Sequence, residues 1–208
     1  MRRLRIWFVL FGVLAGATAA HAGDVIDCSK KSLADAVRDV STKNAVISFT
    51  GVCAGPIVIQ IDGLTLQGIG TAIIDGGGHD VVTVSGTARV SLVDLDVTNG
   101  GIGIVARNGA HVSLAGVNVY DNSSYGMLLQ TASSGVLDNV SAHGNTTGVV
   151  ADDGVSLWVA NSSLTANLSK DLQLTFGSRA DLRTLVFGTY VCDATVLVRG
   201  TSGIVCPH

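Results

Sequence analysis

The sequence predicts an all-β fold of many short strands separated by turns, on three observations. All sixteen acidic residues are Asp and none is Glu, Gly accounts for 26 of the 208 residues, and only 5% of residues are aromatic although 47% are hydrophobic. A turn-rich motif also recurs about every 22 residues. Asp, Asn and Gly favour turns and caps, whereas Glu and Lys favour helices. This composition excludes a helical bundle, a coiled coil and a disordered tail.

The first 22 residues have the pattern of a bacterial-type signal peptide. Three arginines lie within the first five residues, the run Ile6–Ala20 is apolar, and Ala20-His21-Ala22 has the small residues of a cleavage site. The apolar run is shorter than the roughly 20 residues that a membrane span needs. We therefore expect a secreted or periplasmic chain that starts at Gly23, with an uncleaved anchor as the alternative.

Removal of this segment makes the chain more acidic. Ten basic and sixteen acidic residues remain, so the net charge changes from −3 to −6. Nucleic-acid binding needs clustered Lys and Arg to contact phosphates, and the sequence shows no such cluster outside the signal segment. We expect no nucleic-acid partner and no membrane span after cleavage.

Four cysteines remain after export, and they lie in two groups near the two ends of the chain. An even number of cysteines in an exported chain predicts disulfides. Of the three pairings we favour Cys28–Cys53 with Cys192–Cys206, because each bond then closes a local loop and clamps one end. A zinc site is disfavoured, since no pair has close C-x-x-C spacing.

An internal repeat explains the composition. Asn99, Asn122, Asn145 and Asn167 follow one another at spacings of 23, 23 and 22 residues. Alternating apolar residues precede each asparagine, and after the first three a glycine and a second apolar run follow. Each unit therefore contains two short strands joined by a polar turn. One unit cannot bury its apolar side alone, whereas stacked units share a continuous core.

The repeated motif is similar to that of a known family. It appears as Val90-x-Leu92-x-x-Leu95-x-Val97-x-Asn99 and again as Val112-x-Leu114-x-x-Val117-x-Val119-x-x-Asn122. This pattern resembles the right-handed parallel β-helix, the pectate-lyase-like fold, over about Ile57 to Gly188. The resemblance implies a single-stranded β-helix of about six coils with substrates bound along an outer sheet face. It implies no single activity, because the family includes lyases, hydrolases, epimerases and non-enzymes.

Stacked coils give the repeated asparagines a structural role. Identical amides on successive coils lie about 4.8 Å apart and can hydrogen-bond in a ladder. We expect such a ladder from Asn99, Asn122, Asn145 and Asn167. Three of the four also begin Asn-x-Ser/Thr sequons, which we interpret as by-products of the repeat rather than glycosylation sites.

The ends of the solenoid need protection, because open ends expose unpaired strand edges. Ser32 to Val40 has helical spacing, with Ser32 as the N-cap, and this short helix is expected to cover the first coil. The expected organisation is a signal peptide over 1–22, an N-terminal cap with helix and disulfide over 23–56, the β-helix over 57–188, and a C-terminal cap with the second disulfide over 189–208.

The repeat register places polar side chains in outward columns on one sheet. Asp94 and Asp96 are expected mid-strand, and Tyr120 and His143 are expected to be near neighbours. Hydrogen-bonding carboxylates and amides beside a tyrosine suit sugars, so this face is the leading site for a polysaccharide or cell-envelope glycan. The alternative is that outward positions are polar because water is there. The candidate ligand-binding residues are Asp94, Asp96, Asn118, Tyr120, Asn139 and His143.

A weaker second cluster lies on another strand. Arg107, Gln130 and Asp152 share a column, and Asp153 follows directly. Paired carboxylates can act as acid and base in glycoside cleavage. However, Asp152-Asp153-Gly154 is also an ordinary turn sequence, and adjacent residues of a strand point to opposite faces.

Comparison with the enzymes of the resembling family gives no complete catalytic motif. Asn-Thr-Asp and Arg-Ile-Lys elements are absent, and His143-Gly144 lacks the first glycine of Gly-His-Gly. Asp94 and Asp96 could contribute Ca²⁺ ligands, but no Lys or Arg stands beside them to act as a base. Three functions stay open: an exported carbohydrate-recognising module, a polysaccharide lyase, hydrolase or epimerase, and a structural or interaction protein without a ligand.

Overall fold

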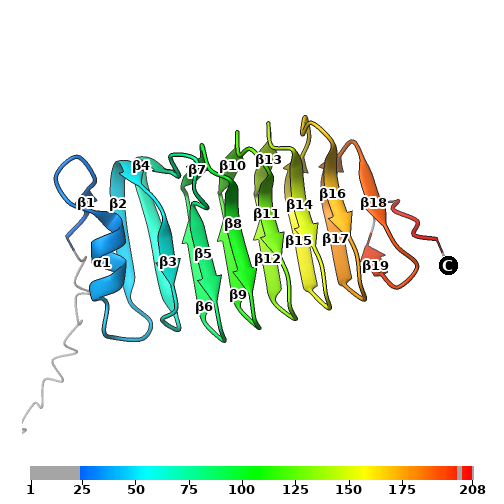
Figure 1. Ribbon diagram of the computed structural model, residues 1–208, viewed down its shortest axis with the longest axis horizontal. Helices are drawn as coiled ribbons and strands as arrows, with labels where there is room; N and C mark the ends of the chain where they lie inside the picture. The colour runs from blue at the N-terminus through cyan, green and yellow to red at the C-terminus, as the bar shows by residue number, and fades with distance from the viewer. Residues whose placement is uncertain (1–23, 201–202, 208) are drawn as a thin grey trace, which may run out of the picture.

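The computed structural model describes residues 24–200 and 203–207 and shows an elongated parallel β-solenoid (Figure 1). The expected signal peptide lies outside the described residues. The solenoid has about eight turns rather than the six expected. The expectation was too low because the parts of the solenoid that contain β2 (Val46–Ala54) and β19 (Leu197–Gly200) were assigned to the two caps, 23–56 and 189–208, and were not counted as coils.

Seven strands form one flat side of the solenoid, which we call the β11 face. They pair in parallel in the order β18-β16-β14-β11-β8-β5-β3, so each turn adds one strand. The strands of the β11 face are β3 (Ile57–Ile59), β5 (Val82–Ser85), β8 (Ile102–Arg107), β11 (Tyr125–Leu129), β14 (Thr147–Ala151), β16 (Lys170–Leu174) and β18 (Tyr190–Cys192).

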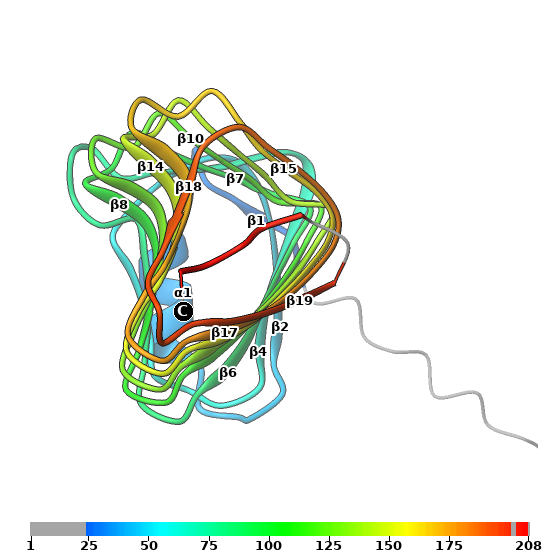
Figure 2. The ribbon, with the colours of Figure 1, turned by 90° about the vertical axis from the view of Figure 1, so that its right-hand side faces the viewer.

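The other twelve strands form one sheet that folds around a corner, so the cross-section has three sides (Figure 2). We call its two sides the β9 face and the β10 face. β2, β4, β15 and β17 run through the corner and contribute to both. These strands are β1 (Ile26–Asp27), β2 (Val46–Ala54), β4 (Leu64–Asp75), β6 (Arg89–Val93), β9 (His111–Ala115), β12 (Ser134–Asp138), β15 (Ser156–Leu164), β17 (Arg179–Phe187) and β19 (Leu197–Gly200), with β7 (Asp96–Thr98), β10 (Asn118–Tyr120) and β13 (Ser141–His143) on the β10 face alone.

Apolar side chains stack in inward columns from coil to coil. Leu92 lies opposite Leu114, which lies opposite Leu137, and the column continues through Val159 to Leu182. All five side chains are fully buried. Such a column gives each coil an apolar neighbour on both sides, which is how a narrow solenoid obtains a continuous core.

The corner between the β9 and β10 faces explains one column of polar residues. Asp94, Gly116, Asn139 and Asn161 all have left-handed backbone, with φ of 52°, 66°, 54° and 50°. Gly, Asn and Asp tolerate this region better than other residues. The prediction that Asp94 lies mid-strand is therefore wrong: it lies between β6 and β7, where the chain turns. Asp96 does lie in a strand, as expected.

The asparagine ladder is confirmed for three residues. Asn122 donates its side-chain amide to Asn145 Oδ1 at 3.0 Å, and Asn145 donates to Asn167 Oδ1 at 3.1 Å. Each also accepts a backbone N–H bond from the coil before it. Asn122 and Asn145 are almost fully buried, so these bonds satisfy amides that water cannot reach.

Asn99 does not belong to this ladder, contrary to the prediction. The backbone N–H of Gly100, not that of Asn99, donates to Asn122 Oδ1 at 3.0 Å. Asn99 instead bonds Asp75 at 2.7 Å and takes a left-handed turn conformation, φ 56°. Val97 pairs with Val119, a step of 22, whereas Asn99 and Asn122 are 23 apart. Asn99 and Asn122 therefore do not occupy equivalent positions on their coils, but positions that differ by one residue.

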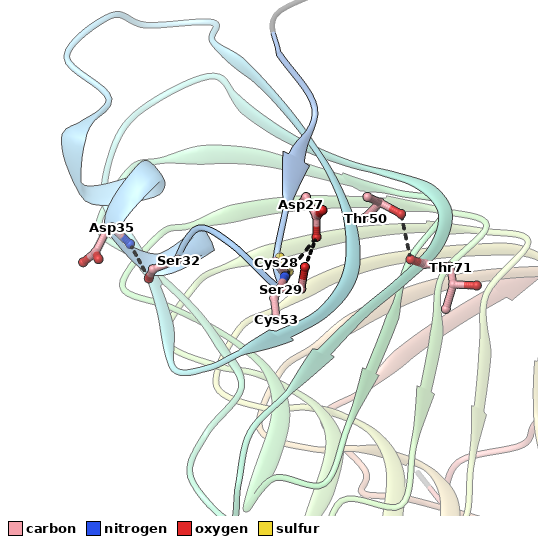
Figure 3. The surroundings of a disulfide bond; sticks show 8 residues. All are labelled: Asp27, Cys28, Ser29, Ser32, Asp35, Thr50, Cys53 and Thr71. Carbon is pink, nitrogen blue, oxygen red and sulfur yellow. Dashed lines mark hydrogen bonds between the residues drawn. A yellow bond between two sulfur atoms is a disulfide. The ribbon is translucent and has the colours of Figure 1, made fainter.

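The N-terminal cap has the expected helix. α1 (Leu33–Asp39) begins at Ser32, whose side-chain oxygen accepts the Asp35 N–H at 3.1 Å (Figure 3). Its buried residues, Leu33 and Val37, pack on the first coil. Cys28 is bonded to Cys53, as predicted, which ties the segment before α1 to β2. No helix in the described part of the chain is long and apolar enough to cross a membrane.

The far end of the solenoid is closed by the second predicted disulfide, Cys192–Cys206. It joins β18 to the segment 203–207, and Cys206 is buried against the core. Before it, β17 and β19 continue the β9 face in regular register, with Asp181 opposite Arg199. The β9 face therefore extends past the last ladder asparagine.

Candidate functional site

The structure brings four of the six expected ligand-binding residues together on the β10 face. Asn118 lies opposite Asp96, and Tyr120 lies opposite His143, each pair on neighbouring strands. Asn118 donates its side-chain amide to Asp96 Oδ1 at 2.8 Å. Asn118 and His143 are exposed, whereas Asp96 and Tyr120 are half-buried. The cluster is therefore a built polar surface and not a set of independent side chains.

Tyr120 and His143 stack on each other. Their ring centroids are 5.4 Å apart and the ring planes differ by only 6°. Because the two residues lie opposite each other on successive coils, the stack runs along the solenoid axis. Each ring thus gives one of its faces to the other, and a ligand on the sheet meets mainly ring edges and the Tyr120 hydroxyl.

The environment keeps the Tyr120 hydroxyl protonated. Burial raises the pKa of the phenol above its ordinary value, and the carboxylates of Asp96, Asp121 and Asp75 raise this pKa further. Proximity of the Thr98 hydroxyl offsets part of the rise. A phenol whose pKa is raised stays a hydrogen-bond donor across the physiological range.

A hollow of about 370 Å³ adjoins this cluster. β4 pairs with β6 as far as Gln67 and with β7 from Ile73 onward, so six residue steps separate the two pairings. On the next coil only three steps, from Val93 to Asp96, separate the partners of these two residues. The extra residues of β4 stand out from the sheet and form one wall. The hollow is lined by Gly70, Thr71, Ala72, Asp94, Leu95, Asp96, Gly116 and Asn118.

The other two expected residues lie at the corner of the sheet. Asp94 borders the hollow from its turn. Asn139 occupies the same corner two coils further on, is exposed, and donates its backbone N–H to Ala160 O at 3.3 Å. The left-handed turn accounts for the residue types at both positions, and only Asp94 adjoins the candidate site.

The second cluster lies in the turns between the β11 and β9 faces. Gln130 and Asp152 each donate a backbone N–H to the coil before, so the expected column with Arg107 exists. Asp152 accepts the Thr175 hydroxyl at 2.7 Å, and Asp153 has left-handed backbone, φ 58°. Both acids therefore have a turn-forming role, which is the alternative that the sequence left open.

A calcium ion does not fit the acids that suggested it. Ca²⁺ takes six to eight oxygen ligands, whereas Asp94 and Asp96 supply two carboxylates, one already bonded to Asn118. Among the described residues no three His, Cys, Asp or Glu side chains are placed to hold a metal ion.

Sequence reasoning missed a groove of about 580 Å³ on the β9 face. Its centre is Trp158, which lies opposite Val136 on one side and Asp181 on the other. The repeat spacing that aligned Tyr120 with His143 on the β10 face could also have aligned the outward residues of the β9 face. Applied there, it would have located Trp158. The groove is lined by Ser134, Gly135, Val136, Ser156, Leu157, Trp158, Arg179, Ala180, Asp181, Leu197 and Arg199.

Charges around this groove are unequally paired. Arg183 binds Asp181 through two hydrogen bonds, both 3.0 Å long. The hydrogen-bonded Arg183 guanidinium and, at longer range, Arg199 hold the pKa of the Asp181 carboxyl below its ordinary value. Arg179 and Arg199 form no ion pair with any described residue. The groove therefore carries a net positive charge in an otherwise acidic chain.

Comparison with known proteins identifies the fold family. The sequence model described as "Right handed beta helix region" matches residues 42–187. Among solved structures, a pectin methylesterase from Erwinia chrysanthemi is similar, with 12% sequence identity and a TM-score of 0.52 over 87% of this chain and 82% of that chain. At this identity the likeness shows the fold alone. Comparison with curated proteins finds no match. The three-sided solenoid and the matched residues show that the chain belongs to the right-handed β-helix family.

Proposed function

We propose that this chain is an exported β-helix module that recognises carbohydrate through the β10 face. The hollow beside Asp96 and Asn118 carries the proposal, because it combines a shaped surface with convergent polar groups. Ligand sites are typically concave and contain a few placed polar groups. A purely solvated sheet face needs neither the projecting wall from β4 nor a hydrogen-bonded carboxylate–amide pair.

The chemistry of the pair suits sugar hydroxyls. The Asn118 amide occupies Asp96 Oδ1, which leaves Asp96 Oδ2 and the Asn118 carbonyl oxygen as acceptors. The Tyr120 hydroxyl adds a donor at the edge of the ring stack. Because the pair is already fixed in position, a ligand that binds it immobilises few side chains, which lowers the entropic cost of binding.

Two observations support export and a polysaccharide partner. The chain forms two disulfides and the described residues contain no free cysteine, which is typical of proteins from oxidising compartments. A structural neighbour is a pectin methylesterase, which is consistent with a polysaccharide ligand for this module.

A glycan panel tests the proposal. We expect the full chain to bind at least one plant, algal or cell-envelope polysaccharide, and we expect Asp96→Asn and Asn118→Ala each to weaken this binding about tenfold. Asp138→Asn is the matched control, because Asp138 accepts the Asn161 amide at 2.9 Å in the same way at the corner. It should bind like the unchanged chain.

The same panel separates the alternatives. Release of reducing or unsaturated ends from any polymer, with or without calcium, would show that the chain is an enzyme and not only a binding module. If the chain bound no glycan, the alternative of a structural or interaction protein without a ligand would be favoured. Equal losses of glycan binding in Asp96→Asn and Asp138→Asn would show that the binding site does not lie at the hollow.

A further inference from the structure

We propose that the groove around Trp158 on the β9 face is a second binding site, which takes an anionic glycan bearing carboxylate or sulfate groups. This groove lies around the corner from the Asp96–Asn118 hollow and shares no lining residue with it. The proposal therefore goes beyond the function proposed for the β10 face and stands independently of it.

Trp158 provides the stacking surface. It points outward from β15, is half-buried, and has Val136 and Asp181 as its column neighbours. No aromatic ring of the described residues stacks on it, in contrast to the Tyr120–His143 pair. Because Trp158 lines the groove, its indole offers apolar surface to the C–H face of a sugar, and its N–H can bond a hydroxyl.

Arginines provide the charge preference. Arg183 neutralises Asp181 through its two hydrogen bonds, so the acid in the groove does not repel an anion strongly. Arg179 and Arg199 both line the groove, are exposed, and have no carboxylate partner among the described residues. A guanidinium presents a planar fork of donors that matches a carboxylate or a sulfate.

The extent of the groove favours an oligosaccharide over a single small anion. It crosses four neighbouring strands, β12, β15, β17 and β19 (Figure 1). At about 4.8 Å between strands these span about 14 Å. The volume of about 580 Å³ also lies within the usual range of ligand sites, about 300–1,000 Å³.

Single-stranded nucleic acid also combines stacking with phosphate charge, but the whole chain disfavours it. Nucleic-acid binders present many clustered cations because phosphates repeat along the strand. Here two arginines without an ion pair to a described residue line the groove, on a chain with more acidic than basic residues. An anionic glycan needs fewer cations and gains more from the polar serines, Ser134 and Ser156, that line the groove.

Tryptophan fluorescence tests the site directly. The sequence has two tryptophans, so in a full chain carrying Trp7→Phe the emission reports on Trp158 alone. The probes are polygalacturonate, alginate and dextran sulfate, beside methyl-esterified polygalacturonate, esterified alginate and dextran as neutral counterparts. We expect a saturable change in the emission with at least one anionic polymer. The neutral counterpart of that polymer should bind at least tenfold more weakly, and added salt should weaken the binding of the anionic form. Comparison of the carboxylated polymers with dextran sulfate shows which anionic group the groove prefers.

Variants separate binding from folding. Arg199→Gln and Arg179→Gln should each weaken binding about tenfold with an unchanged melting temperature, because both side chains are exposed. Arg107→Gln is the matched control, an exposed arginine outside the groove and without an ion pair to any described residue, and should bind normally. Because the emission comes from Trp158 in the groove, which shares no lining residue with the Asp96–Asn118 hollow, loss of this site is distinguished from loss of the β10 site.

Any of several results would overturn the proposal. Three of them are no fluorescence change with any anionic polymer, equal binding of the charged and neutral forms, and tighter binding of single-stranded DNA than of any glycan. An equal loss in Arg107→Gln and Arg199→Gln would also overturn it, because the effect would then be one of total charge rather than of the groove.

Discussion

Asn167 donates its side-chain amide to the buried carboxylate of Asp171 at 2.8 Å, so the asparagine ladder ends on an acid. Asp171 is only 3% exposed. Its other oxygen accepts the backbone N–H groups of Gly188 and Thr189, at 3.0 and 2.7 Å. One side chain thereby joins the last ladder coil to the chain that begins the C-terminal end.

The ladder is expected to stabilise the fold measurably. Asn145→Ala removes the bonds to Asn122 and Asn167 inside the core and leaves buried backbone groups unpaired. We expect a loss of about 1–3 kcal/mol in the free energy of unfolding, measured by denaturant titration. Asn118→Ala, an exposed strand residue, should change this free energy by less than about 0.5 kcal/mol. Equal effects of the two changes would contradict a buried ladder.

Asp171 should make stability depend on acid pH. Burial alone would raise its pKa, but hydrogen bonds from Thr189, Asn167 and Gly188 outweigh burial and lower the pKa below its ordinary value of 3.8. The folded state therefore releases this proton more readily than the unfolded state. The stabilisation is complete above about pH 4 to 5 and is lost as the pH falls through the lowered pKa.

The variant Asp171→Asn isolates this acid. Its unfolding free energy should fall by about 1–3 kcal/mol at neutral pH, and its stability should decline less steeply between neutral pH and pH 2 than that of the unchanged chain. Asp153→Asn, at an exposed turn, serves as the control and should keep the original acid profile. An unaltered profile in Asp171→Asn would show that another group dominates acid unfolding.

Gly126 is expected to admit no larger residue. A Cβ atom there would lie 2.6 Å from the backbone oxygen of Gly148 in β14 and 2.8 Å from Nδ2 of the ladder residue Asn145. Gly126→Ala should therefore destabilise by about 3 kcal/mol, as over-packing of a core does, measured by thermal unfolding. Gly101→Ala is the control, because its nearest contact is the Asp80 side chain at 3.2 Å; a melting temperature lowered as far as in Gly126→Ala would refute the steric argument.

The N-terminal disulfide should contribute to stability as well as to the cap. Cys28→Ser with Cys53→Ser frees the segment before α1 from β2, and we expect a loss of about 2–5 kcal/mol. Denaturant unfolding of this double variant, with the unchanged chain under reducing conditions for comparison, measures the effect. An unfolding free energy equal to that of the oxidised chain would mean that α1 holds the first coil without the bond.

Much of this architecture was predictable because a solenoid repeats local patterns. Alternating apolar residues near Leu92 and Leu114 predict both strand and facing side, and the N-cap at Ser32 predicts where α1 begins. The disulfides followed from the grouping of four cysteines. Asn99 shows where such reasoning fails: residues of one type at a matching spacing lie in different registers when one turn is a residue longer than its neighbour.

The candidate sites were predictable in part. The pairing of Tyr120 with His143 follows from the 23-residue step alone. The wall beside Asp96 does not, because the extra residues of β4 lie before the first regular repeat and their direction depends on the sheet beneath them. Asp94 was misplaced because Asp is compatible both with a left-handed turn and with an outward strand position such as that of Asp96.

The sequence by itself determined the stacking unit, its inward columns and its closed ends, since these depend on residues within one or two coils. Only the tertiary structure decided which outward residues share a hollow. Trp158, Asp181 and Arg199 come from three successive coils, and the last two of these coils lack the asparagine by which the register was read. Their meeting depends on strands continuing in parallel past the end of the visible repeat, because backbone hydrogen bonding extends the sheet whether or not the side-chain motif persists.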